Sequence, residues 1–251
     1  MPDSKVYGPE FFEAQVEGSL RSARVVAPIV CELVRPSSVV DVGCGCGAWL
    51  SALRECGISR VLGLDGDYVR RSSLLVPQDC FRAANLEKPI SLGEKFDLAL
   101  CLEVAEHLPR IAAPILVASL AKLSPVVLFS AAIPLQRGTN HVNEQWPQYW
   151  AELFERFGFK RIDAIRPRIW TDARVEWWYR QNMFLFVRED HIGLYPALAK
   201  AVTAADDLML VHAAVLNEHV WLRPILRRLP ARVFSAAAGR LRRRNGQSGH
   251  D

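Results

Sequence analysis

The stretch from Val39 to Leu50 combines residue types that a small-molecule site needs. It reads VVDVGCGCGAWL, in which an apolar run leads to Asp41 and then to glycines at positions 43, 45 and 47. Glycines after a strand let the backbone approach a ligand closely, and a following helix offers unpaired N–H groups. With Ala48 counted, the spacing also fits the dinucleotide pattern G-x-G-x-x-G/A. The glycines alone therefore leave the ligand open.

The polar neighbours of this stretch favour a cationic nucleoside over a pyrophosphate. Asp41 lies two residues before Gly43, where a carboxylate would repel a phosphate and attract an ammonium group. Asp65 closes the next apolar run, in VLGLDGD, and could accept hydrogen bonds from both hydroxyls of a ribose. Asn85, in AANLEKP, could contact an adenine amino group. An NAD(P)-dependent oxidoreductase is the alternative that the glycine pattern leaves.

Four motifs in this order resemble the class I S-adenosylmethionine-dependent methyltransferases: VVDVGCGCGAW, LGLDGD, the Asn85-Leu86 pair and FDLALCLEVAEHL. The resemblance covers about residues 36–187. It implies a Rossmann-like α/β fold with a seven-stranded sheet, order 3-2-1-4-5-7-6, the last strand antiparallel and helices on both faces. It implies S-adenosyl-L-methionine as the cofactor.

The same resemblance places the Gly43–Gly47 loop on the methionine part of that cofactor, Asp65 on the ribose, and Asn85 and Leu86 at the adenine. The family usually has Asp at position 85, and Asn keeps an acceptor oxygen. The full set of expected cofactor-binding residues is Asp41, Gly43, Cys44, Gly45, Gly47, Asp65, Gly66, Asn85, Leu86, Leu102 and Glu103.

Methyl transfer to a hydroxyl requires an aligned acceptor and a group that removes its proton. The long segment RGTNHVNEQWPQYW follows the fifth expected strand, and loops of this length are usually functional. It offers His141 as a general base, since a histidine titrates near neutral pH, and Glu144 as the next candidate. The structural alternative is that His141 ties the loop to backbone groups.

Glu103, Glu106 and His107 have the spacing of neighbours on one helical turn. A similar E-x-x-E-H run occurs in the quinone-biosynthesis O-methyltransferases, where a divalent cation has been proposed. We expect no metal here, and expect instead that Glu103 lines the cofactor cleft while the other two brace the loop.

Strand-like and helix-like segments alternate along the chain, which favours a mostly parallel sheet with helices on both faces. Strands are expected at Ser38–Val42, Arg60–Leu64, Cys80–Ala83, Phe96–Cys101, Val126–Ser130, Lys160–Ile165 and Asn182–Val187. Helices are expected at Pro9–Val34, Ala48–Cys56, Ala112–Lys122, Gln148–Phe157 and Pro196–Val220.

The apolar stretch Ile111–Leu135 has the length of a membrane span, but three prolines divide it. We expect a buried helix and a central strand there.

The sequence predicts a methyltransferase domain over residues 1–190, with residues 1–35 as a helical lid that contacts the cofactor through Tyr7 and Phe11. Residues 191–251 would form a helical C-terminal extension.

Charge is distributed unevenly along the 251 residues, whose formal net charge is +4. Residues 221–251 hold eight arginines and one acid, so this tail carries +7 and the remaining 220 residues carry 4 − 7 = −3. The acidic body gives no reason to expect nucleic acid as a partner. The basic tail, in which apolar residues interrupt the arginines, suits a weak contact with an anionic membrane or a protein, or a solvated end.

The six cysteines lack metal-like or paired spacing, so we expect reduced thiols and a cytoplasmic protein. The function we expect is methylation of a small molecule, by O-methylation in secondary metabolism or glycan biosynthesis. A non-catalytic cofactor-binding partner subunit is an alternative from another class.

Overall fold

The computed structural model describes residues 9–199 and 211–213, and contacts divide the chain into units 1–212 and 213–251. The description below concerns the first unit. Its strands are β1 (Ser38–Val42), β2 (Arg60–Asp65), β3 (Phe81–Ala83), β4 (Leu98–Leu102), β5 (Val126–Ser130), β6 (Phe159–Ile162) and β7 (Phe184–Arg188). Its α-helices are α1 (Pro9–Val34), α2 (Ala48–Glu55), α3 (Ala113–Leu123), α4 (Pro147–Glu155), α5 (Arg166–Ile169), α6 (Trp177–Asn182) and α7 (Pro196–Ala199).

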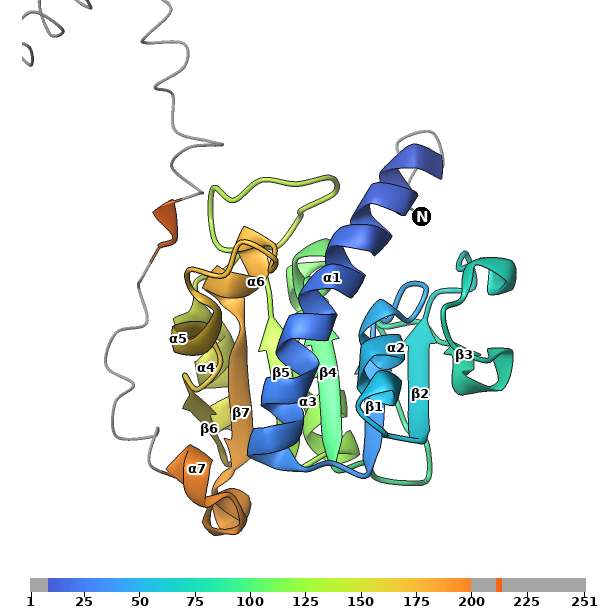
Figure 1. The fold of residues 1–251 in the computed structure, drawn as a ribbon. Coiled ribbons are helices and arrows are strands. Elements are labelled where there is room, and N and C mark those ends of the chain that lie inside the picture. The colour runs from blue at the N-terminus through green and yellow to red at the C-terminus, as the bar shows by residue number, and fades with distance from the viewer. Residues whose placement is uncertain (1–8, 200–210, 214–251) are drawn as a thin grey trace, which may run out of the picture. The chain divides into compact units, whose positions relative to one another are not determined.

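The strands form one sheet in the order β3-β2-β1-β4-β5-β7-β6 (Figure 1). Strand β1 pairs in parallel with β2 and β4, and β4 pairs in parallel with β5. Strand β7 runs antiparallel to both of its neighbours, β5 and β6. The fold class expected from the sequence, including the strand order and the antiparallel last strand, is confirmed.

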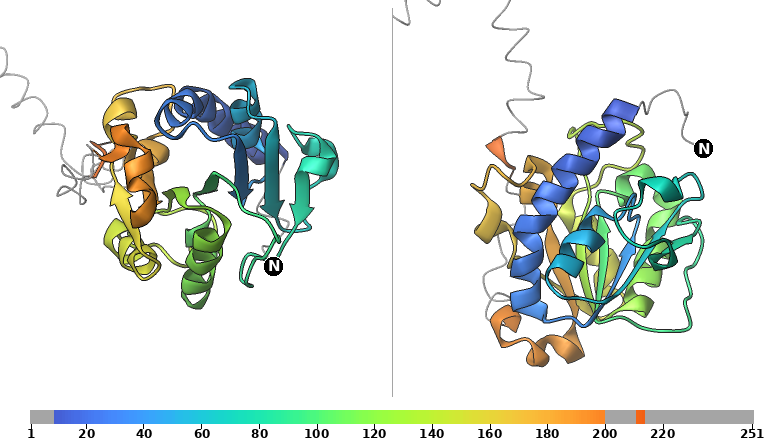
Figure 2. Two further views of the ribbon diagram at one scale, coloured as in Figure 1. Left: turned by 90° about the horizontal axis from the view of Figure 1, so that it is seen from below. Right: turned by 45° about the vertical axis from the view of Figure 1, so that its right-hand side comes forward.

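Helices cover both faces of the sheet, as the view along it shows (Figure 2, left). Successive strand residues point to opposite faces, so each central strand contributes to two cores. Val39 packs in a core with α1 and α2, whereas Val40 packs in a core with α3 and α4. Because strands β1, β4 and β5 are buried on both faces, their sequences are continuously apolar apart from Ser38, Asp41 and Ser130.

The apolar stretch Ile111–Leu135 folds as expected, into helix α3 followed by the central strand β5. Within the part of the chain that the structure describes, no helix has both the length and the hydropathy needed to cross a membrane.

Some expected elements have different bounds in the structure, and two helices were missed. Helices α5 and α6 were not expected from the sequence, and α6 takes up Gln181 and Asn182, so the last strand begins at Phe184. The helix expected over Pro196–Val220 is wrong as a continuous element, because α7 ends at Ala199 and residues 211 and 212 are not helical. The other residues of that extension, and the basic tail, lie outside the described residues. The expected domain boundary at residue 190 stays a prediction.

The parallel strands bring their carboxyl ends to one edge of the sheet, the upper edge in Figure 1. The segments that follow β1, β2, β4 and β5 therefore meet at this edge. Strand β7 adds its amino end there, since Phe184 pairs with Phe129 in the antiparallel register. The segment after β3 begins at the same edge because β3 runs parallel to β2, and together with it these five segments hold the candidate site.

Candidate cofactor and acceptor site

The loop after β1 is built around three glycines with positive φ angles, at positions 43, 45 and 47. Gly43 has a φ of 86°, and a Cβ atom there would lie 2.3 Å from Cγ2 of Val104. Gly45 has a φ of 52°, and its N–H donates to Oδ2 of Asp65 over 2.7 Å. The loop ends at Gly47, which precedes α2, and no side chain caps that helix. Bare backbone is thus presented at the sheet edge, as expected for a ligand-binding loop.

Asp41 lies at the end of β1, where its side chain is only 2% exposed. Its Oδ2 atom has no hydrogen-bond partner among the described residues. Burial, and secondarily the charge of Asp65, raises the pKa of Asp41 to about 7. A buried carboxylate without a partner is costly, so a cationic ligand beside it would be stabilising. Cys44 next in the loop is also buried and its Sγ packs against Gly63.

Asp65 ends β2 as expected, with both carboxylate oxygens already bonded inside the protein. Oδ2 accepts from Gly45, while Oδ1 accepts from the N–H of Gly66 and the hydroxyl of Tyr68, at 2.7 and 2.5 Å. The ring of Tyr68 lies over Gly66 and is 64% exposed. A carboxylate has about four acceptor positions, so Asp65 can accept both hydroxyls of a ribose only if one of these three bonds is shared or exchanged.

Asn85 and Leu86 follow β3 at the same edge. Leu86 is buried in the core, whereas Asn85 is exposed and its Oδ1 accepts the N–H of Glu87 over 2.9 Å. This bond closes a local turn, which leaves the side-chain amino group as the freer hydrogen-bonding group of Asn85.

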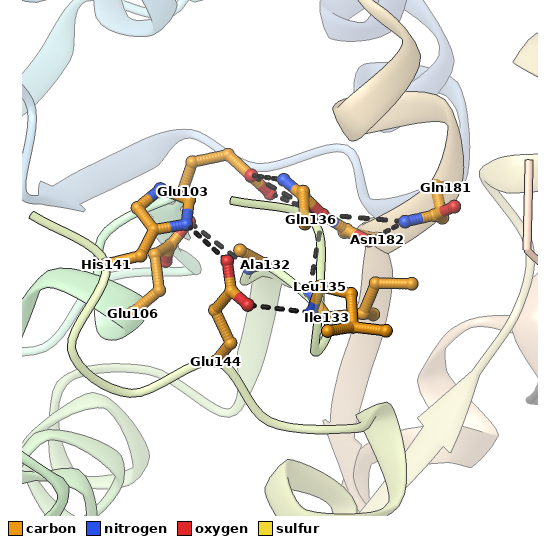
Figure 3. Close-up of polar contacts among 10 residues, drawn as sticks. All are labelled: Glu103, Glu106, Ala132, Ile133, Leu135, Gln136, His141, Glu144, Gln181 and Asn182. Carbon is orange, nitrogen blue, oxygen red and sulfur yellow. Dashed lines mark hydrogen bonds and ion pairs between the residues drawn. The ribbon is translucent and has the colours of Figure 1, made fainter. Parts of the chain in front are cut away.

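Leu102 ends β4, and Glu103 follows it with a left-handed backbone, at a φ of 54°. The expectation that Glu103, Glu106 and His107 share one helical turn is wrong, because the turn is a short 3₁₀ helix that begins only at Ala105. The Glu103 carboxylate turns instead toward two amides (Figure 3): it accepts Nε2 of Gln136 over 3.2 Å and Nδ2 of Asn182 over 3.2 Å. Burial raises the pKa of Glu103, and these amides oppose the shift.

The long loop after β5 is fastened to that 3₁₀ turn. The backbone N–H groups of Val142 and Asn143 donate to the carbonyl of Glu106, over 2.9 and 3.0 Å. Oε1 of Glu106 accepts the N–H of Ala132 over 3.2 Å, while its Oε2 has no partner among the described residues. Burial, and secondarily the charge of Glu103, raises the pKa of Glu106 well above its ordinary value.

His141 and Glu144, the two residues expected to be catalytic, form a hydrogen-bonded pair within this loop. Nδ1 of His141 lies 2.9 Å from Oε1 of Glu144, whose Oε2 accepts the N–H of Leu135 over 2.8 Å. The imidazole lies over Gly138, where a Cβ atom would be 2.2 Å from Nε2. It also stacks edge to face with His107, at 4.9 Å between centroids.

A cation site is geometrically available beside this pair. Ligand atoms of Glu106, His107 and His141 all lie within 4.8 Å of one another, and carboxylate and imidazole are ligands that divalent metals take. His107 is exposed overall, but desolvation of its ring, and secondarily the charge of His141, lowers its pKa, so this ring is neutral at pH 7. Glu103 is not part of the group.

The whole edge is acidic and lacks matching cations. Asp41, Asp65, Glu103 and Glu106 converge there, and none of the ion pairs between described residues involves any of the four. Such a site suits a positively charged ligand far better than a phosphate.

Four side chains of the site were not singled out from the sequence: Tyr68, Gln136, Gln181 and Asn182. The sequence signal that could have found them is their position relative to the strands and the long loop. Gln136 shares the loop of His141, and the Gln-Asn pair immediately precedes a strand that runs antiparallel to β5, which places it at the carboxyl edge of the sheet. The side chains of Tyr7 and Phe11 lie outside those described, so their expected contact with the cofactor stays a prediction.

Comparison with known proteins identifies the family. A family model described as a methyltransferase domain matches residues 13–205. The ubiquinone biosynthesis O-methyltransferase of a Methylobacterium strain is 33% identical over 112 residues, which are 42% of this chain and 44% of that protein. The chain thus matches less than half the length of that relative.

Two solved structures illustrate the likeness in fold. The sugar N-methyltransferase of a Streptoalloteichus species superposes with a TM-score of 0.54 at 15% identity, over 75% of this chain and 98% of that one. The magnesium protoporphyrin IX methyltransferase of Synechocystis, with bound S-adenosylhomocysteine, gives 0.50 at 20% identity, over 73% and 89%. With the family model spanning most of the chain and the sheet order agreeing, the protein belongs to the class I S-adenosylmethionine-dependent methyltransferases.

Proposed function

We propose that this chain transfers a methyl group from S-adenosylmethionine to a hydroxyl of a small molecule. The cofactor carries an ammonium and a sulfonium group, and the acidic edge without paired cations fits that charge. Asp41 and Glu103 would face the charged amino-acid part, and Asp65 the ribose. The cofactor supplies an activated methyl group; the protein supplies alignment and a route for the acceptor proton.

The observation that carries the proposed chemistry is the His141–Glu144 pair at this edge. A carboxylate at Glu144 accepts a hydrogen bond from Nδ1–H of His141 and so favours the tautomer whose Nε2 can accept a proton. Nε2 would take the acceptor's hydroxyl proton as the new C–O bond forms, and Glu144 would stabilise the resulting imidazolium. The relative whose name specifies O-methylation supports a hydroxyl acceptor. We place this reaction in secondary metabolism or glycan biosynthesis.

The first experiment incubates the protein with methyl-labelled S-adenosylmethionine and a metabolite extract, followed by mass spectrometry. A labelled small molecule is expected. Binding of the cofactor without any labelled product would instead support a non-catalytic partner subunit.

The role of His141 is tested with two substitutions. His141→Ala should lower turnover by roughly 10²-fold, the usual contribution of a positioned base. Gly138→Ala should act in the same direction, because the added Cβ would displace the imidazole. Neither should change cofactor affinity in calorimetry, since the cofactor residues lie on other loops. His191→Ala, which removes a surface ion pair with Asp190, is the control and should change neither turnover nor cofactor affinity.

A chelator separates the base from the cation site that shares His141. A general base needs no metal, so turnover is expected to survive ethylenediaminetetraacetic acid. Loss of turnover that Mg²⁺ restores would assign His141 to a cation site with Glu106 and His107. Unaltered turnover of His141→Ala would move the base to Glu144 or indicate an amine acceptor.

A further inference from the structure

Three buried amide side chains form a continuous chain of hydrogen bonds that ends at Glu103 (Figure 3). We call Gln181, Asn182 and Gln136 the amide array; each is at most 4% exposed. Nε2 of Gln181 donates to Oδ1 of Asn182 over 3.0 Å, and Nδ2 of Asn182 donates to Oε1 of Gln136 over 2.9 Å. Asn182 and Gln136 then donate to Glu103.

The direction of this array is set at its two ends by backbone N–H groups. A side-chain amide can present either its oxygen or its nitrogen, but a backbone N–H can only donate. The N–H of His212 donates to Oε1 of Gln181 over 2.8 Å, and the N–H of Ile133 donates to Oε1 of Gln136 over 3.3 Å. Both glutamine oxygens are thereby fixed, and their amino groups must point inward along the array.

As a result, the two amides next to Glu103 both present donors to its carboxylate. With Gln181 donating to its Oδ1, Asn182 can offer only Nδ2 to Glu103, and Gln136 likewise offers only Nε2. Donors directed at a carboxylate favour its charged form, which burial would otherwise disfavour. The backbone carbonyl of Gln181 accepts a hydrogen bond from Nη1 of the buried Arg166 over 3.2 Å, which fixes the start of the array.

Glu103 lies on the methionine side of the proposed cofactor site. Strand β1 separates β4 from β2, so Glu103 and the ribose residue Asp65 lie on opposite sides of Asp41. The charge that the array stabilises is therefore directed toward the cationic part of the cofactor and away from its nucleoside.

We propose that Gln181 is a positioning residue that, through Asn182 and Gln136, holds Glu103 as an oriented anion, and that the segment at His212 sets its polarity. The backbone of His212 thus supports the active site, although His212 lies far from Glu103 in sequence. The inference rests on the proposed function, because it takes Glu103 to face the charged part of S-adenosylmethionine.

The test compares two ligands that differ in charge. S-adenosylmethionine carries both cationic groups, whereas 5′-methylthioadenosine has the same nucleoside and neither charge. Gln181→Met keeps the side-chain length and removes the three hydrogen bonds of the side-chain amide, to Asn182, Gln136 and the N–H of His212. It should weaken S-adenosylmethionine binding by about tenfold in calorimetry and leave 5′-methylthioadenosine binding unchanged. Gln148→Met, at an exposed glutamine of α4 that bonds Glu152, is the matched control.

The contribution of His212 is tested by a pair of variants in the full chain. His212→Ala removes the imidazole and its 3.0 Å contact with the carbonyl of Trp170 but keeps the backbone N–H. His212→Pro removes both. Only His212→Pro should reproduce the ligand-selective loss, because only the N–H fixes the oxygen of Gln181.

A double-mutant cycle assigns the effect to Glu103. In a Glu103→Gln background, Gln181→Met and His212→Pro should cause no further loss of S-adenosylmethionine affinity. Equal weakening of both ligands, additive losses in the Glu103→Gln background, or unchanged binding in Gln181→Met would each overturn the inference. Absence of S-adenosylmethionine binding by the parent protein would refute the proposed function instead.

Discussion

The hydroxyl of Tyr68 occupies a position on Asp65 that a ribose hydroxyl would need. It donates to Oδ1 over 2.5 Å, and Oδ1 also accepts the N–H of Gly66. Because Tyr68 is largely exposed, its hydroxyl can return to water when a ligand arrives. Tyr68→Phe should therefore tighten S-adenosylmethionine binding by roughly 2- to 10-fold, the net value of one hydrogen bond, as measured by calorimetry.

Two variants calibrate that measurement. Asp65→Ala should weaken binding by ~30- to 150-fold, because it removes a charged acceptor of two ribose hydroxyls. Tyr149→Phe makes the same chemical change on α4, away from Asp65, and should have no effect. Weaker binding in Tyr68→Phe would mean that the hydroxyl joins the ribose contact and does not compete with it.

The buried carboxylate of Asp41 predicts a pH dependence of cofactor binding. Its pKa is raised to about 7 in the free protein, so protonated Asp41 stabilises the fold at low pH and this stabilisation is lost as pH rises through about 7. A cationic ligand prefers the ionised form, so affinity for S-adenosylmethionine should increase from pH 5.5 to 8. Asp41→Asn should bind more weakly at pH 8, with a shallower pH dependence. An identical pH profile in the variant would show that other carboxylates govern the step.

At the level of single residues, the sequence was informative where chemistry and strand position coincide. Asp41, Asp65 and the His141–Glu144 pair lie at the sheet edge because each follows, or ends, a recognisable apolar run. Gln136 and Asn182 were not found, because 46 residues separate them and a buried amide has no pattern of its own in a sequence. The left-handed backbone of Glu103 was equally invisible, since glutamate has no preference for it.

Among the elements, strands buried on both faces were the easiest to predict. The apolar runs of β1 and β5 gave both ends of each strand correctly. Helices α5 and α6 were missed because they have four and six residues, too few for a hydrophobic period to appear. Helix α6 nevertheless delivers Gln181 and Asn182 to the site, and α5 holds Arg166, which donates to the backbone carbonyl of Gln181.

Helix α6 also links the two helices that flank the cofactor loop. The hydroxyl of the buried Tyr179 meets Oγ of Ser19 in α1 at 3.1 Å and accepts Nε1 of Trp49 in α2 over 3.4 Å. Tyr179→Phe should reduce the free energy of unfolding by about 1–3 kcal/mol, since both partners lose a buried hydrogen bond. Urea denaturation measures the change, with Tyr195→Phe as the control outside α6. A loss below about 0.5 kcal/mol would show that packing alone joins these helices.

For the molecule as a whole, charge separates the acidic body from the arginine-rich tail, a division seen in the sequence. Four carboxyl groups gather at the carboxyl edge of the sheet, where none of the ion pairs between described residues involves them. The tail lies outside the described residues, so its contact with an anionic membrane or a protein partner stays a proposal. The fold, in contrast, followed from four short motifs, because each one marks the end of a particular strand.

The choice of cofactor should be visible as a change in the stability of the whole domain. A ligand that binds only the folded state at about 100 times its Kd adds about 2.7 kcal/mol to the free energy of unfolding. For a domain of this size that corresponds to a rise in Tm of roughly 5–10 °C. S-adenosylmethionine and S-adenosylhomocysteine should both produce it in thermal unfolding, because both carry the ammonium group and the nucleoside. NAD should leave Tm unchanged, since its pyrophosphate would lie against Asp41 and the other unpaired carboxylates. A rise with NAD of the same size would return the protein to the oxidoreductase alternative and contradict the electrostatic reading of the site.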